Sequence, residues 1–149
     1  MKTLYLIGIF IIVVILTRGP LEEQEAEKKQ QDVTYSVPFK ATLIKNLGGP
    51  KKHWAKYSFE YKDNSYDFDI TYKEYYDDFE KIQNETKLIG RKILQQIIKE
   101  GRNPSEIFIN VSITQEAGKG ETGQKLYRYF GLVSYDSTSD QMIFKMHNP

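Results

Sequence analysis

Apolar and polar residues alternate through much of the chain after residue 34, and this period of two constrains the fold more than any other feature. Alternation places every second side chain on one face of a strand, so that one face can be buried. The apolar positions form six runs: Tyr35, Val37, Phe39, Ala41, Leu43; Tyr57, Phe59, Tyr61; Tyr66, Phe68, Ile70, Tyr72; Ile107, Ile109, Val111, Ile113; Tyr127, Tyr129, Val133; and Met142, Phe144, Met146. The pattern predicts six strands.

A short turn joins the second and third runs. It consists of Lys62-Asp63-Asn64-Ser65, whose central Asp-Asn pair is typical of a tight hairpin. Such a turn pairs Tyr61 with Tyr66 and Phe59 with Phe68. Both aromatic runs then lie on the same face of the sheet, as a single buried face requires.

One segment between the strands has the period of a helix. Its apolar positions recur every three or four residues, which is typical of an amphipathic helix. They are Phe79, Ile82, Thr86, Ile89, Ile93 and Ile97, flanked by Leu88, Leu94 and Ile98. Asp77 or Asp78 is suited to cap the start of this helix, and Gly101 with Pro104 is suited to end it.

These elements predict an α+β fold with the order βββαβββ, in which a mostly antiparallel sheet of about six strands packs on or curls around one long helix. A helix about 10 Å across cannot cover six strands that are about 4.8 Å apart. We therefore expect the sheet to curl around the helix. The alternative is that a tyrosine-rich strip of its inner face stays open.

An apolar helix is predicted before this domain, because residues 4–16 are apolar or Gly. The uncharged run of residues 3–17 would span about 22 Å as a helix, less than the roughly 30 Å of a bilayer core. Lys2 and Arg18 can extend to the two interfaces. Residues 1–20 are thus predicted to be a membrane anchor, or else a signal segment. Cleavage after Gly19 is disfavoured because Pro20 follows.

The remaining chain divides into a charged spacer, residues 21–33, and a single exported domain, residues 34–149. Lys2 favours a cytoplasmic N-terminus, which places the domain outside the membrane. The chain has no Cys, which fits a bacterial or phage protein better than a eukaryotic secreted domain. We therefore expect a single-pass protein of the cell membrane with a periplasmic or extracellular domain. Secretion after signal cleavage is the alternative.

The composition argues against several functions. Lys and Arg number 21 and Asp and Glu number 20, so the chain lacks the basic excess of a nucleic-acid binder. Its two histidines, His53 and His147, match no zinc or Ser-His-Asp spacing. The segment Gly118–Gly123 is rich in Gly but lacks the Lys-Ser/Thr of a phosphate loop. The sequence predicts no catalytic residue, cofactor or metal, and hence a protein that is not an enzyme.

Three carboxylates share the outward face of the second and third predicted strands: Glu60, Asp67 and Asp69. The hairpin register places Glu60 opposite Asp67, where the two should repel. If the first run is a strand, Lys40 lies opposite Glu60 and the face is an ordinary charged surface. Catalysis by a carboxylate pair is the less favoured interpretation.

Two surfaces are candidates for binding. The first is a basic and aromatic loop, Lys51, Lys52, His53, Trp54 and Lys56, which would contact anionic lipid or an acidic partner, or is simply a solvated loop. The second is an apolar patch on the outer face of the last three strands: Phe108, Leu126, Phe130, Leu132 and Ile143. This patch requires that Val133 pair with Met142 and Ile113 with Tyr127. Burial under residues 21–33 or another part of the chain is the alternative to an interface.

The leading hypothesis is a non-enzymatic binding or assembly module, held outside a bacterial membrane by one N-terminal helix. Its partner would be another envelope protein or a second copy of itself, and the membrane would be contacted through residues 3–17. One alternative is a secreted or periplasmic inhibitor or immunity-type protein that blocks an enzyme with the loop Glu116–Gly123. The other is a carrier that holds a small apolar ligand between helix and curled sheet.

Overall fold

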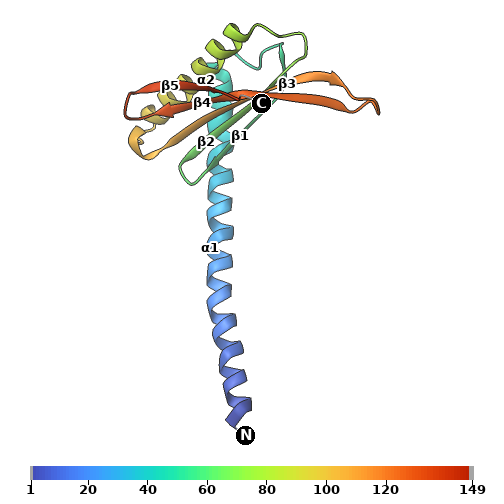
Figure 1. The fold of residues 1–149 in the computed structure, drawn as a ribbon. Coiled ribbons are helices and arrows are strands. Elements are labelled where there is room, and N and C mark those ends of the chain that lie inside the picture. The colour runs from blue at the N-terminus through green and yellow to red at the C-terminus, as the bar shows by residue number, and fades with distance from the viewer. Residues whose placement is uncertain (1, 148–149) are drawn as a thin grey trace.

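The chain folds as two helices and a five-stranded mixed sheet that is not closed (Figure 1). The computed structural model describes the backbone of residues 2–147 and the side chains of residues 22–147. The elements are α1 (Lys2–Asn46), β1 (Trp54–Lys62), β2 (Ser65–Tyr72), α2 (Phe79–Lys99), the 3-10 helix η1 (Pro104–Glu106), β3 (Phe108–Lys119), β4 (Lys125–Asp136) and β5 (Gln141–Met146). The strands lie in the order β1-β2-β3-β4-β5.

The middle pair of strands is parallel. β2 pairs with β3 in parallel, while the other three neighbouring pairs are antiparallel. The parallel pair arises because α2 crosses over the sheet and returns the chain to the end at which β2 began. The α+β class is confirmed, but the predicted six strands and the order βββαβββ are wrong.

The first predicted strand is part of a helix. Tyr35, Phe39 and Leu43 are four residues apart, so they lie on one face of a helix as well as on one face of a strand. The residues between them distinguish the two structures. Val37 is 66% exposed and Ala41 is also exposed, whereas Phe39 and Leu43 are 2% and 0% exposed. The buried face therefore has the period of a helix.

α1 is one continuous helix of 45 residues, about 68 Å long. It runs through the predicted spacer, residues 21–33, and across the predicted domain boundary without a break, so a separate N-terminal apolar helix is not formed. Among the residues whose side chains are described, no helix is long and apolar enough to span a membrane. The predicted anchor, residues 1–20, lies outside the residues whose side chains are described; of this segment the structure describes only the backbone of residues 2–20.

The last turns of α1 pack on the aromatic inner face of β1 and β2. The Phe39 ring stacks on Phe59, with centroids 5.1 Å apart, and is tilted against Tyr66 at 5.2 Å. Leu43 and Tyr66 are fully buried. Removing a side chain of this size from water stabilises a fold by roughly 1.5–3 kcal/mol, so this contact holds α1 firmly against the sheet.

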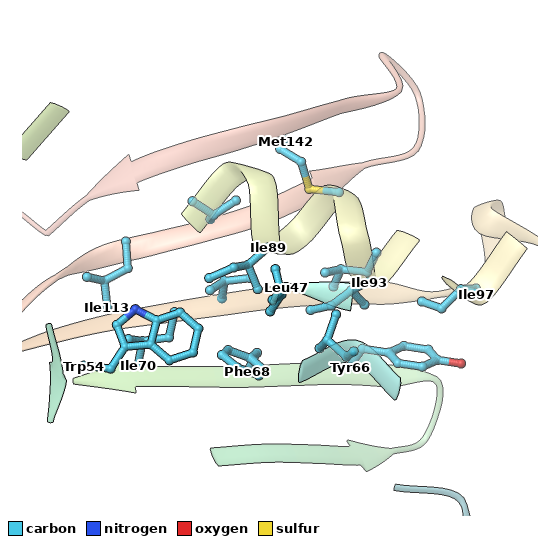
Figure 2. Close-up of a cluster of buried hydrophobic side chains, with 14 of the residues drawn as sticks. Leu47, Trp54, Tyr66, Phe68, Ile70, Ile89, Ile93, Ile97, Ile113 and Met142 are labelled. Atoms are coloured by element: carbon cyan, nitrogen blue, oxygen red, sulfur yellow. The ribbon is translucent and has the colours of Figure 1, made fainter. Parts of the chain in front are cut away.

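α2 covers the other half of the same face, against β3, β4 and β5. Asp78 caps its first turn by accepting a hydrogen bond from the Lys81 amide, as predicted. The side chains of Ile89, Ile93 and Ile97 point from α2 into the sheet (Figure 2). Met142 of β5 lies over Gly90, where a Cβ would be 2.8 Å from the Met142 sulfur. Two helices thus cover the five strands, and the sheet does not have to curl around one helix.

The hairpin between β1 and β2 has the predicted register. Tyr61 pairs with Tyr66 and Phe59 with Phe68. Asp63 and Asn64 occupy the turn with φ values of 51° and 64°, the left-handed region that such a turn needs and that Asn and Asp tolerate. Glu60 lies opposite Asp67, as predicted. Lys40 does not lie opposite Glu60, because it belongs to α1, where its ammonium group lies over the Tyr57 ring at 5.0 Å.

The predicted register of the last three strands is wrong. Ile113 pairs with Gly131 and Val133 with Phe144. The first shift arises because β3 and β4 extend beyond the predicted strand ends, and β4 carries a bulge at Phe130. The second arises because Asp136 accepts hydrogen bonds from the Thr138 amide and the Ser139 hydroxyl, which delays the return of the chain to Gln141.

Gly131 is required beside the bulge. Its φ is +157°, and a Cβ there would lie 2.4 Å from the Lys145 carbonyl oxygen. The bulge shifts the alternation of β4 by one residue, so that different alternate residues face α2 on its two sides. At the bulge, Phe130 faces α2 and contacts the Phe79 ring at 6.0 Å; after it, Val133 faces α2 and is fully buried.

The helical face of α1 can be tested with two substitutions. A strand would bury residues 37 and 43 equally, but the helix buries only Leu43. We expect Leu43→Ala to lower the free energy of unfolding by about 2–5 kcal/mol, and Val37→Ser to change it by less than about 0.5 kcal/mol. Urea unfolding followed by circular dichroism measures both. Equal losses in the two variants would contradict the helical assignment.

Candidate functional site

A groove of about 900 Å³ lies between α1 and the free edge of β1. Seven residues of α1, from Glu25 to Val37, form one wall. Residues 58–63 of β1 and its turn form the other, together with Asp69 of β2. The side chains involved are Glu25, Lys28, Lys29, Asp32, Val33, Ser36, Val37, Ser58, Phe59, Glu60, Tyr61, Lys62, Asp63 and Asp69.

A cluster of tyrosines around Arg102 fixes the point at which α1 leaves the domain. The Arg102 guanidinium lies 4.3 Å from the Tyr35 ring centre and 5.1 Å from that of Tyr61, and it donates a hydrogen bond to the Tyr61 hydroxyl. The Tyr35 hydroxyl donates to Glu100 at 2.5 Å and lies 3.2 Å from the Tyr66 hydroxyl. Burial, with these hydrogen bonds, raises the pKa of Tyr35 far above its ordinary value. The cluster joins α1, both strands of the hairpin and the end of α2.

α1 also protects part of the free edge of β1. The Ser36 hydroxyl accepts a hydrogen bond from the Tyr61 amide at 3.2 Å. The Lys28 ammonium pairs with the Asp63 carboxylate across the mouth of the groove, and this hydrogen bond holds the pKa of Asp63 below its ordinary value. An edge strand needs such protection against pairing with other strands. The groove is therefore bounded by polar contacts at both of these points.

The rest of the groove has a modest excess of carboxylates: Glu25, Asp32, Glu60 and Asp69 against Lys29 and Lys62. Asp32, Glu60 and Asp69 line it, and none forms an ion pair with a described Lys, Arg or His. Asp69 accepts a hydrogen bond from the Ser58 hydroxyl at 3.1 Å. Glu60 faces Asp67, and like charges opposite each other on neighbouring strands are destabilising. A cation placed here would relieve this repulsion.

Two exposed valines lie on the α1 wall of the groove. Val33 is 55% exposed and Val37 is 66% exposed, one helical turn apart. Phe59 contributes a half-buried ring from β1. The groove thus combines an apolar strip with a charged border that has more carboxylates than lysines.

A second polar cluster surrounds Glu85 of α2. The Glu85 carboxylate accepts hydrogen bonds from the Trp54 indole at 2.6 Å and from the Tyr72 hydroxyl at 3.0 Å, and it contacts the His53 ring nitrogen at 2.7 Å. The His53 ring stacks on Tyr76, with centroids 4.1 Å apart. Burial raises the pKa of Tyr72 far above its ordinary value, and the Glu85 charge adds to the effect. The cluster ties the start of β1 to α2.

The predicted basic loop does not act as one unit. Trp54 is 6% exposed, and His53 is bound to Glu85. Lys51 donates to the Leu47 carbonyl and so caps the end of α1. Only Lys52 and Lys56 are exposed, and the Lys56 ammonium lies over the Tyr127 ring at 4.7 Å. The loop follows the C-terminal end of α1, at the opposite end of the helix from the predicted anchor (Figure 1).

The predicted apolar patch is divided between the two faces of the sheet. Phe130 faces α2, and by alternation Leu126 lies on that side too. On the outer face, Leu132 pairs with Ser112 and Lys145, and Ile143 pairs with Ser134. Phe108 is 67% exposed and pairs with Ser65. Polar residues thus separate Phe108 from Leu132 and Ile143, and the structure does not bring the five residues together.

The described residues hold no group of three or more His, Asp and Glu arranged to bind a metal ion. The segment Gly118–Gly123 joins two strands as expected, with Gly118 and Gly123 at φ values of 99° and 80°. The groove was not predicted because its α1 wall includes residues assigned to a spacer and a strand. The spacing of Val33 and Val37, parallel to that of Tyr35, Phe39 and Leu43, is the sequence signal for it.

Comparison with known protein families, characterised proteins and solved structures finds no match to this chain.

The Glu85 cluster should matter for stability. Glu85→Leu leaves the Trp54 indole and the Tyr72 hydroxyl without their acceptor in a largely buried setting. We expect a loss of about 2–4 kcal/mol in the free energy of unfolding, because each unsatisfied buried donor costs about 1–3 kcal/mol. Chemical denaturation measures it, and Gln95→Leu, at an exposed position of α2, is the matched control. Similar stability of the two variants would show that the cluster is dispensable.

Proposed function

We propose that the protein is a non-enzymatic binding or assembly module, held on the outer side of a bacterial membrane by its N-terminal helix. The observation that carries the proposal is the continuity of α1. The same helix that contains the uncharged residues 3–17 runs on to Asn46, and its C-terminal turns bury Phe39 and Leu43 in the core of the domain. A membrane anchor built in this way would hold the domain without a flexible linker.

The position of the groove supports a binding role. It lies where α1 leaves the sheet, between residues 25–37 and β1, and it holds exposed valines beside unpaired carboxylates. From Leu16 to Glu25 a helix rises about 14 Å. A groove at this height would face neighbouring proteins of the same membrane. We propose that it is the surface through which the module binds its partner.

A second candidate function follows from the hairpin of β3 and β4. This hairpin projects beyond the rest of the sheet (Figure 1), and Leu126 and Tyr127 on it are 42% and 48% exposed. A projecting loop that includes Glu116–Gly123 suits a secreted or periplasmic inhibitor or immunity-type protein. No comparable observation favours a carrier of apolar ligands, because the side chains between α2 and the sheet pack against one another (Figure 2).

Fractionation of bacteria that express the full chain tests the anchored module directly. We expect the protein in the membrane fraction after washing at high pH, with residues 1–20 retained in its mass, because an uncleaved apolar helix is released only by detergent. Protease added to spheroplasts, in which a periplasmic or extracellular domain is accessible, should cleave the protein on the outer side of the membrane. A soluble mature protein that begins after Gly19 would contradict the anchor and favour the inhibitor.

A further inference from the structure

The exposed face of α2 is basic and partly apolar. Along its last three and a half turns it carries Lys87, Arg91, Lys92 and Lys99 without any acidic residue, and none of these forms an ion pair with a described residue. Leu88 and Ile98, on the same stretch, are 51% and 52% exposed. We name these six residues the basic face of α2. They lie opposite the buried isoleucines of the helix.

The basic face of α2 complements the groove. The groove offers two exposed valines beside Asp32, Glu60 and Asp69, and the basic face offers two exposed aliphatic side chains among four cations. Among the described residues, the four cations of the basic face form no ion pair, and the groove has two more carboxylates than lysines. Complementary charge of this kind directs association and fixes its register.

The two surfaces also lie at similar heights along α1. The Gln96 amide donates to the Phe39 carbonyl, and Tyr35 donates to Glu100, so the C-terminal end of α2 is level with residues 35–39 of α1. These residues adjoin Val33 and Val37 of the groove. The surfaces belong to different halves of the molecule, because α1 lies against β1 while α2 lies against β3, β4 and β5. A neighbour with the same orientation can therefore bring one surface to the other.

We propose that the groove receives the basic face of α2 from a second copy of this chain. The copies would stand side by side with their α1 helices pointing in the same direction, as an anchor in one membrane requires. Each copy would use two different surfaces, so the contact is heterologous and continues into a ring or a row. This inference rests on the proposed function and names the partner of the proposed groove.

Other uses of the basic face fit the structure less well. An anionic membrane surface would need the helix to lie in the membrane plane. The contacts with Phe39 and Tyr35 of α1 at one end, and with His53 and Trp54 in the segment that follows α1 at the other, instead fix α2 beside the C-terminal part of α1. The following experiment distinguishes a second copy of this chain from an unrelated acidic protein as the partner of the basic face.

The test uses cysteine cross-linking, since the native chain has no Cys. Full-length chains with Val37→Cys, in the groove, are mixed with chains with Gln95→Cys, on the exposed side of α2, in nonionic detergent at low salt. A short bismaleimide should join the two kinds of chain to each other, and neither kind to itself. The cross-linked yield should fall in about 1 M salt, because the Debye length is then about 3 Å and the charges across the contact are largely screened.

Charge reversal gives the decisive comparison. Arg91→Glu with Lys99→Glu in the Gln95→Cys chain should lower the cross-linked yield more than about tenfold, because like charges across an interface repel strongly. Adding Asp32→Lys with Glu60→Lys to the Val37→Cys chain should restore it. The matched control, Lys52→Glu with Lys73→Glu in the Gln95→Cys chain, reverses as many charges away from the basic face and should leave the yield unchanged.

Three results would overturn the pairing: no mixed product above that of the control, equal loss in the Lys52 and Lys73 control, or a dominant product between identical chains. Failure of the pairing is distinguishable from failure of the proposed function. Chains that fractionate with the membrane but give no mixed product keep the anchored module and exclude self-pairing through the groove. Chains that are released as soluble protein yet give the mixed product exclude the anchored module and keep the pairing through the groove.

Discussion

The packing of α1 against the aromatic face of β1 and β2 is the contact on which the rest of the structure depends. Phe39 and Leu43 are removed from water there, and the Arg102 cluster closes the contact at the point where α1 leaves the domain. Without it, β1 and β2 would expose a row of aromatic side chains, since α2 covers only the other half of the sheet. The same contact creates the groove, because the groove is the space between the departing helix and the edge of β1.

The helical conformation of this part of α1 also has a free-energy cost, which the packing offsets. Pro38 lies inside α1, where a proline removes one backbone hydrogen bond and disfavours the helix by about 3 kcal/mol. The Ser36 and Thr34 hydroxyls bond to the carbonyls of Asp32 and Gln30 in this region. The free energy gained by burying Phe39 and Leu43, which follow the proline, is large enough to outweigh this cost. Tertiary packing, more than helix propensity, thus keeps this part of α1 helical.

Much of the domain follows from local sequence rules. The hairpin register is determined by the Asp63-Asn64 turn, and the limits of α2 by the Asp78 cap and by Gly101. The helical state of residues 35–43 could not be read from the same rules, because a spacing of four is a multiple of two and fits both periods. The choice between them is made by the aromatic face of β1, which lies far along the chain and needs a helix to cover it.

The candidate site was less accessible to sequence reasoning than the fold. The predicted apolar patch depended on strand registers that a single bulge at Phe130 and the Asp136 turn both shift. The parallel pairing of β2 with β3 depends on where α2 returns the chain, which no local pattern specifies. The groove depends on the angle at which α1 leaves the sheet, and this angle is determined by Tyr35, Glu100 and Arg102, which are distant in sequence.

The central claim is that α1 holds a fixed direction relative to the domain. The distance between spin labels on Glu23→Cys of α1 and Gln95→Cys of α2, both at exposed positions, measures this directly in the full chain. A rigid α1 predicts one narrow distance distribution that broadens when Arg102→Ala removes the centre of the tyrosine cluster. A broad distribution in the unmodified background, unchanged by Arg102→Ala, would contradict the account.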